Sequence, residues 1–264
     1  MPENTVYFVG CGPGDPELVT VKARRLIRDA DVIVYSGSLI PEPIIAMAGK
    51  DAELHDASGL VREEISEILY RGASADGKKT VLRLHDGDPA IYGAIREQID
   101  ELAKRDIRSV VVPGVTSFLA SSAALGTQLT LPGVTQTIII TRAESRTKVP
   151  EAESIAELAR HGATMIFYLS VHLIREIVSE AKKGGYGDAT PAAVIYRASW
   201  DDEKVIKGTL ADIEQKVRDA RVTKTAIIMI GDVLNPESYE YSRLYDKEFS
   251  HGYRKASVPD KGDD

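Results

Sequence analysis

Three glycines at alternate positions, Gly10, Gly12 and Gly14, follow an apolar run near the start of the chain. Glycines placed this way can let backbone N–H groups face a phosphate, as in the dinucleotide fingerprint Gly-x-Gly-x-x-Gly. Here the third position of that fingerprint holds Asp15, which brings a carboxylate to where an anion would sit. Pro13 also removes a backbone donor from such a cradle. A dinucleotide is therefore disfavoured, and an NAD-dependent oxidoreductase stays only as an alternative.

Three further stretches place small residues, a turn and a polar group directly after an apolar run. They are "HDGDPAIYG" (85–93), "PGVTS" (113–117) and "YRAS" (196–199). In open α/β sheets, ligands bind outside the carboxyl ends of the strands, and glycine there lets a ligand approach the backbone closely. Taken singly, Gly87 belongs to an ordinary turn signature and Thr116 is a usual helix N-cap residue. Several such strand ends together predict a ligand site.

Strands and helices alternate through the first half of the sequence. Five Val- and Ile-rich runs without strict alternation predict a parallel sheet that is covered on both faces. Segments with apolar residues at three- and four-residue spacing lie between them and predict helices over 16–30, 61–73 and 90–106. This repetition predicts an α/β fold. The strands are expected over 5–10, 30–36, 52–56, 80–88 and 107–114.

The second half of the chain predicts a separate, mixed sheet. Only a turn around Trp200–Asp202 separates two of its strands, which we therefore expect to form an antiparallel hairpin. Its strands are expected over 136–143, 163–170, 191–199, 204–210 and 225–234, and its helices over 151–161, 171–185 and 210–220. We expect an N-terminal α/β domain over 1–113, a connecting segment over 114–126, a C-terminal α/β domain over 127–245 and a tail over 246–264 that ends in a solvated stretch.

Composition and charge narrow the class of protein. The 264 residues are 43% hydrophobic and 28% charged, as in soluble globular proteins, and no apolar run is long enough to span a membrane. The net charge of -7 disfavours nucleic acid as a partner. The single cysteine, Cys11, cannot form an internal disulfide, which together with the absence of a signal-peptide pattern favours the cytoplasm. We expect Cys11 to be a small buried residue rather than a nucleophile. The five scattered histidines form no Cys/His cluster, so we expect no metal held by the protein.

The stretches "VGxGPGDPxLxT", "DGDPxxYG" and "PGVTS" together resemble the tetrapyrrole (corrin/porphyrin) methylase family over roughly residues 5–250. The longer stretch 129–170, with "VYSGSLIP" and "SRLYDKEFSHGYR", resembles the branch that methylates carbon 11 of precorrin-4 or cobalt-precorrin-4 in cobalamin (vitamin B12) biosynthesis. The resemblance implies two α/β domains, S-adenosyl-L-methionine as methyl donor in the cleft between them, S-adenosyl-L-homocysteine as product, and a homodimer. Methylation at another ring position and a non-catalytic tetrapyrrole carrier stay as alternatives.

The resemblance also assigns the cofactor site position by position. Pro13 lines it from the first loop, and Asp86, Gly87 and Asp88 match the family's Gly-Gly-Asp segment, with Asp86 departing from the first glycine. A carboxylate such as Asp88 can accept hydrogen bonds from the cofactor's amino-acid or ribose donors. The other residues assigned to the cofactor are Ile91, Thr116, Ser117, Leu169, Ala198, Thr225 and Ala226.

The implied reaction is nucleophilic substitution at the sulfonium methyl by an electron-rich ring carbon, for which the protein mainly aligns the reacting atoms. Relatives that methylate uroporphyrinogen have an aspartate, proposed as proton acceptor, at the position of Ser36. Serine cannot take that role, so no catalytic acid or base is assigned, and Ser36 and Ser38 are expected only to contact the substrate. The planar guanidinium of arginine can donate two parallel hydrogen bonds to a carboxylate, so arginines suit the carboxylates of a tetrapyrrole. Arg142 and Arg146 are the leading candidates, ahead of Arg83, Arg175 and Arg197.

Overall fold

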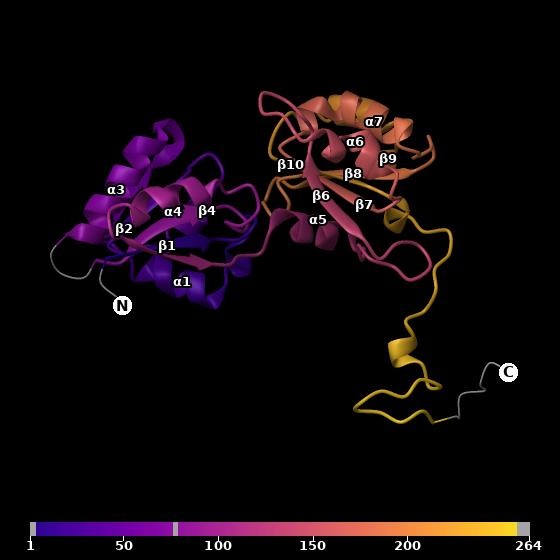
Figure 1. Ribbon diagram of the computed structural model, residues 1–264, viewed down its shortest axis with the longest axis horizontal. Helices are drawn as coiled ribbons and strands as arrows, with labels where there is room; N and C mark the ends of the chain where they lie inside the picture. The colour runs from indigo at the N-terminus through magenta and orange to yellow at the C-terminus, as the bar shows by residue number, and fades with distance from the viewer. Residues whose placement is uncertain (1–3, 76–78, 258–264) are drawn as a thin grey trace. The chain divides into compact units, whose positions relative to one another are not determined.

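The structure is a computed structural model that describes residues 4–75 and 79–257 (Figure 1). The chain divides into two compact units. Segments 195–205 and 222–227 group with the N-terminal part of the chain, although their neighbours in sequence belong to unit 2. Unit 1 consists of Met1–Gly126, Ile195–Val205 and Val222–Ile227, and unit 2 of Thr127–Val194, Ile206–Arg221 and Ile228–Asp264.

Unit 1 is built on a five-stranded sheet with the strand order β3-β2-β4-β1-β5. Every pairing between these strands is parallel, which confirms the predicted parallel sheet. The five strands are β1 (Thr5–Gly10), β2 (Val32–Tyr35), β3 (Glu53–Asp56), β4 (Val81–His85) and β5 (Arg108–Val112). Both central strands, β1 and β4, are buried along their whole length because helices cover the two faces of the sheet.

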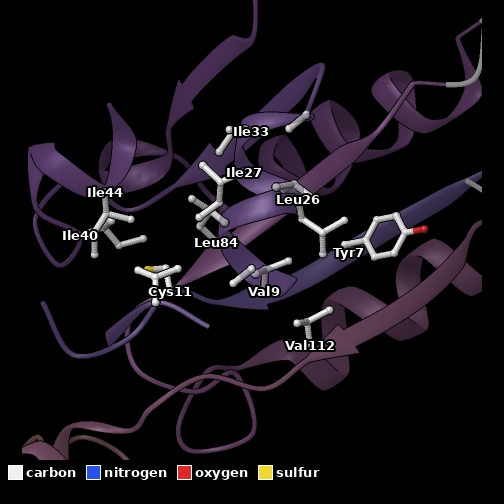
Figure 2. Close-up of a cluster of buried hydrophobic side chains, with 14 residues drawn as sticks. Tyr7, Val9, Cys11, Leu26, Ile27, Ile33, Ile40, Ile44, Leu84 and Val112 are labelled. Carbon is white, nitrogen blue, oxygen red and sulfur yellow. The ribbon is translucent and has the colours of Figure 1, made fainter. Parts of the chain in front are cut away.

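Two hydrophobic clusters, one on each face of this sheet, form the core of unit 1. Successive side chains of a strand point to opposite faces, so Val9 and Leu84 belong to the first cluster and Phe8 and Val81 to the second. The first cluster, drawn in Figure 2, packs against α1 and α2, and the second packs against α3 and α4. These helices span Val21–Arg28 (α1), Glu42–Ile45 (α2), Arg62–Ser74 (α3) and Ile95–Ala103 (α4).

The second sheet belongs mainly to unit 2 and has the strand order β6-β7-β10-β8-β9. Because β6 pairs parallel with β7 and β7 pairs antiparallel with β10, the sheet is mixed, as predicted. Neighbouring strands β8 and β9 are joined by residues 197–203, a connection short enough only for an antiparallel pair. The elements are β6 (Ile138–Arg142), α6 (Ile155–Ala159), β7 (Thr164–Tyr168), α7 (Ile174–Lys183), β8 (Pro191–Tyr196), β9 (Lys204–Thr209), α8 (Ile213–Asp219) and β10 (Ala226–Ile230).

Several helices differ from their predictions. The helix expected over 16–30 begins only at Val21, and the short helix α2 was not predicted. The stretch after "PGVT", expected only as a connecting segment, forms the helix α5 (Ser117–Leu125), to which alanine's high helix propensity contributes. The helix expected over 90–106 begins only at Ile95, because Tyr92 and Ala94 have φ angles of 55° and 48°, which no right-handed helix contains. The solvated stretch expected at the end of the tail lies, beyond Ser257, outside the described residues. In the described part of the chain, no helix is long and apolar enough to cross a membrane.

Candidate functional site

The loops that follow β1, β4 and β5 meet at four glycines of unit 1. Gly87 N donates to the carbonyl oxygen of Gly12 at 2.8 Å, which joins the first two loops. A Cβ atom on Gly114 would lie 2.2 Å from the carbonyl oxygen of Gly87, and one on Gly10 would lie 2.7 Å from Gly114 N. Only glycine permits backbones to approach this closely. The glycines of the sequence motifs therefore bring three strand ends together.

Asp88 fastens two of these loops to each other. Its Oδ1 accepts a hydrogen bond from Ala90 N at 2.8 Å, and its Oδ2 accepts one from Gly114 N at 2.9 Å. The hydrogen bond from Ala90 N is the turn contact that the sequence Gly87-Asp88-Pro89 indicates. A carboxylate has about four lone-pair sites, so Asp88 can still accept hydrogen bonds from a ligand beside the glycines.

The segment around Gly87 also lies against the N-terminus of helix α5. A Cβ atom on Gly87 would lie 3.5 Å from both Thr116 Cα and Ser117 N. Thr116 occupies the N-cap position of α5. The first N–H groups of a helix have no partner within the helix and form the positive end of its dipole. This end of α5 is therefore suited to a carboxylate, such as that of an α-amino acid.

Titratable residues at the end of β4 differ in their exposure. Arg83 and His85 are each only 7% exposed, whereas Asp86 is exposed. Arg83 Nη1 donates to the carbonyl oxygen of Val34 at 3.3 Å, so this arginine supports the sheet. Burial lowers the pKa of His85, which stacks on Phe8, to about 3 and keeps the imidazole neutral. Nearby protein desolvates Asp86 and raises its pKa, and the charge of Arg83 opposes that rise.

The loop after β1 is also joined to the turn formed by residues 197–203 of unit 1. The carbonyl oxygen of Pro13 accepts a hydrogen bond from Trp200 Nε1 at 2.8 Å. Asp15 N donates to Ser199 Oγ at 3.0 Å. Sequence reasoning missed the roles of Ser199 and Trp200, because nothing in the local pattern of the turn indicates a contact with a loop so distant in sequence.

Ala198 is buried within the same turn. The adjacent residue Arg197 donates its backbone N–H to the carbonyl oxygen of Thr225 at 3.0 Å, directly before Ala226 begins β10. Unit 1 therefore contains every residue that the resemblance assigns to the cofactor except Leu169. Leu169 belongs to unit 2, where it follows β7.

Left-handed backbone conformations concentrate at the predicted site residues and their neighbours. Nine described residues other than glycine have positive φ angles. Such conformations cost energy and cluster at ligand-binding sites. Leu169 is one of them, and 67% of its surface is exposed although its side chain is apolar. Packing of the fold requires neither its left-handed backbone nor its exposure. Six of the nine lie in or beside the predicted site: Tyr92, Ala94, Leu169, Arg197, Ser199 and Thr225.

The residues expected to contact the substrate come from both units. Ser36 follows β2 and its carbonyl oxygen accepts two backbone N–H groups of the next turn, in which Ser38 is exposed. Arg142, at the end of β6, donates to three carbonyl oxygens of the loop 143–148, at 2.9, 3.0 and 3.3 Å. Arg146 is exposed in that loop. Arg142 therefore shapes the loop, and Arg146 is the arginine that the loop presents to solvent.

Two other arginines near strand ends have acidic partners. Arg175 Nε donates to Glu214 at 2.9 Å, and Arg197 Nη1 donates to Asp202 at 2.8 Å. Arg175 belongs to α7 and is largely exposed, so this ion pair contributes little to stability.

Cys11, beside the glycines, is a packing residue, as predicted. It is fully buried, its thiol donates to the carbonyl oxygen of His85 at 3.1 Å, and it belongs to one cluster with Ile40 and Ile44 (Figure 2). Burial raises the pKa of the thiol to about 12, so the reactive thiolate is not populated at neutral pH. Among residues 4–75 and 79–257, no three His, Cys, Asp or Glu side chains are grouped so that they could hold a metal ion.

Comparisons with known proteins agree with the sequence resemblance. The family model for Tetrapyrrole (Corrin/Porphyrin) Methylases matches residues 5–214. The cobalt-precorrin-4 C(11)-methyltransferase of Methanocaldococcus jannaschii is 51% identical over 251 residues, which cover 95% of this chain and 96% of that protein. A solved structure of a cobalt precorrin-4 methyltransferase, a cobalamin biosynthetic enzyme, matches with a TM-score of 0.85 and 40% identity, covering 89% of this chain and 99% of that one. Uroporphyrin-III C-methyltransferase from Thermus thermophilus, in complex with S-adenosyl homocysteine, matches with a TM-score of 0.73 and 30% identity, covering 89% and 95%.

Proposed function

Because the chain belongs to the tetrapyrrole (corrin/porphyrin) methylase family, we propose that it transfers a methyl group from S-adenosylmethionine to carbon 11 of precorrin-4 or cobalt-precorrin-4 in cobalamin biosynthesis. The observation that supports this most strongly is the 51% identity to a cobalt-precorrin-4 C(11)-methyltransferase along 95% of the chain. An identity this high over both whole lengths favours the same ring position. From the family resemblance we also propose a cytoplasmic homodimer.

The polar groups of unit 1 fit the proposed cofactor. S-adenosylmethionine has an α-amino acid, a sulfonium centre and an adenosine, and it has no phosphate. Its carboxylate suits the N-terminus of α5 at Thr116 and Ser117, and its amino group suits the carboxylate of Asp88. Pro13 and Ala198 are the residues that the resemblance places against the nucleoside. A relative of 30% identity has been solved with S-adenosyl homocysteine bound.

When bound, the cofactor supplies a methyl group that is already activated for transfer. The residues of this chain have to orient the two reactants, and effective alignment alone accounts for a large part of such rate enhancements. The glycine contacts between the three strand-end loops provide rigid support for this task. Cys11 takes no part as a nucleophile because its thiol is buried and protonated. In the proposed direct substitution at the methyl group, no residue of the protein has to form a covalent intermediate.

The dinucleotide alternative does not fit the loop after β1. A pyrophosphate site requires a helix N-terminus directly at the glycines. Here α1 begins only at Val21, after a 3-10 turn over Pro16–Leu18. Asp15 caps that turn by accepting a hydrogen bond from Glu17 N at 2.8 Å. The carboxylate thus occupies the place that a phosphate would need.

Mass spectrometry of the tetrapyrrole product tests the proposed function. The purified chain is incubated with precorrin-4 and, separately, with cobalt-precorrin-4, each with S-adenosylmethionine labelled in the methyl group. We expect one added methyl, which NMR of the label should locate on carbon 11. A label on another ring carbon would assign the chain to another branch of the family. No methylation of either substrate, or stabilisation against heat by NAD instead of S-adenosylhomocysteine, would refute the proposal.

A further inference from the structure

The only tryptophan of the chain, Trp200, contacts the first glycine-rich loop. Its indole Nε1 donates to the carbonyl oxygen of Pro13 at 2.8 Å. A Cβ atom on Gly14 would lie 2.2 Å from the indole Cδ1 and 2.3 Å from Nε1, so the ring lies directly on the backbone of the loop. Ser199, the preceding residue, accepts a hydrogen bond from Asp15 N at 3.0 Å. Two adjacent side chains therefore hold three consecutive residues of the loop.

The turn that contains Trp200 is itself held firmly. Ser199 N donates to Glu203 Oε2 at 2.7 Å, and Trp200 N donates to the carbonyl oxygen of Arg197 at 3.0 Å. The Arg197 guanidinium lies 4.7 Å from the centre of the indole and is paired with Asp202. Arg197 and Ser199 both have left-handed φ angles, which persist only where the surroundings fix them. The turn is therefore a preformed support for the loop.

We propose that Trp200 and Ser199 are positioning residues for the cofactor: they hold the loop at Pro13 in the conformation that binds the adenosyl group. The same turn contains Ala198, so one rigid element fixes both residues that the resemblance places against the nucleoside. This inference rests on the proposed function, in which S-adenosylmethionine is the methyl donor. When a loop can leave its binding conformation, the apparent affinity falls with the fraction of molecules that remain competent.

Trp200→Phe removes the donor to Pro13 and retains an aromatic ring against Gly14. Loss of one neutral hydrogen bond corresponds to about a fivefold change in an equilibrium constant. We therefore expect the Kd of S-adenosylhomocysteine, measured by isothermal titration calorimetry, to rise about fivefold. The KM for S-adenosylmethionine should rise by a similar factor, and kcat at saturating cofactor should stay within about twofold. Ser199→Ala, which removes the acceptor for Asp15 N, should raise the same Kd.

Tyr186→Phe is the matched control. The Tyr186 hydroxyl donates to the carbonyl oxygen of Ala163 in unit 2, so this variant also loses one bond from an aromatic side chain to a carbonyl. Both aromatic variants should lower the melting temperature, and only Trp200→Phe should weaken binding. A lower melting temperature with wild-type affinity in both Trp200→Phe and Ser199→Ala would show a merely structural role and overturn the proposal.

Tryptophan fluorescence provides a second readout, because all of it comes from Trp200. Addition of S-adenosylhomocysteine to the wild-type chain should change the emission with the Kd that calorimetry gives. Binding that calorimetry detects without any change in emission would count against the proposal. These measurements need no tetrapyrrole, so they can fail while the methylation test succeeds. If the wild-type chain does not bind S-adenosylhomocysteine at all, the proposed function fails, and this inference fails with it.

Discussion

Gly114→Ala would disturb the close contact between the loops after β4 and β5. Real Cβ atoms essentially never approach another heavy atom within 3.0 Å, so an added Cβ at 2.2 Å from the Gly87 carbonyl oxygen forces the loops apart by at least ~0.8 Å. The hydrogen bond from Gly114 N to Asp88 Oδ2, now 2.9 Å long, would then exceed hydrogen-bonding distance. Asp88 would lose the contact that joins the two loops.

The expected loss of stability follows from these two effects. A hydrogen bond to a charged group contributes about 1.5–3 kcal/mol, and overpacking costs about 1–3 kcal/mol. We therefore expect the free energy of unfolding of unit 1 to fall by about 3–5 kcal/mol, which lowers its melting temperature by roughly 10–20 °C in scanning calorimetry. Because Asp88 would no longer be held in position to bind the cofactor, and a hydrogen bond to a charged group contributes about 1.5–3 kcal/mol, the Kd of S-adenosylhomocysteine should rise at least about tenfold.

Gly59→Ala is the control for this substitution. No heavy atom lies within 4 Å of the Cβ position of Gly59, and its φ angle is not positive. The change should stabilise the chain by about 0.4–1 kcal/mol or leave it unchanged, through the smaller entropy of the unfolded state. If Gly114→Ala melts and binds the cofactor product as Gly59→Ala does, the close contact does not support the site and the reasoning is wrong.

Ser36→Ala should lower the methyl-transfer rate by about tenfold or less, roughly 1.4 kcal/mol, since serine is no strong base. A loss of about a thousandfold in rate with unchanged cofactor affinity would contradict this. Arg146→Ala should raise the KM for the tetrapyrrole in steady-state kinetics and leave cofactor binding nearly unchanged, and Arg142→Ala should do so more strongly because it also releases its loop. Weaker cofactor binding in either variant would refute this division of roles. The buried, neutral His85 should make the protein less stable as pH falls below the ordinary pKa of 6.5, because only the unfolded state takes up the proton until about pH 3. This loss reaches about 1.4 kcal/mol one pH unit below 6.5, and calorimetry of His85→Leu should lack it; parallel pH profiles of the two proteins would exclude His85 as the cause.

Both sheets could be predicted because their signals are local. The continuous apolar runs of β1 and β2 are typical of parallel strands buried on both faces, and the short link between β8 and β9 allows only one direction of pairing. Helix α5 was not predicted because its run of small residues has no amphipathic periodicity. The late start of α4 was also missed, since the left-handed angles of Tyr92 and Ala94 have no signal in residue type.

By itself the sequence determined the family, the order of the strands along the chain and the glycines at the strand ends, because motifs and hydrophobic periods are properties of neighbouring residues. Tertiary structure alone decided that Trp200 donates a hydrogen bond to Pro13, that Asp88 joins two loops, and that Arg142 donates hydrogen bonds to carbonyl oxygens of its own loop. The first two contacts join residues far apart in sequence, and their energies depend on distances and angles of a few tenths of an ångström. No local propensity contains that information, so the functional use of these residues is set by the packing of the fold.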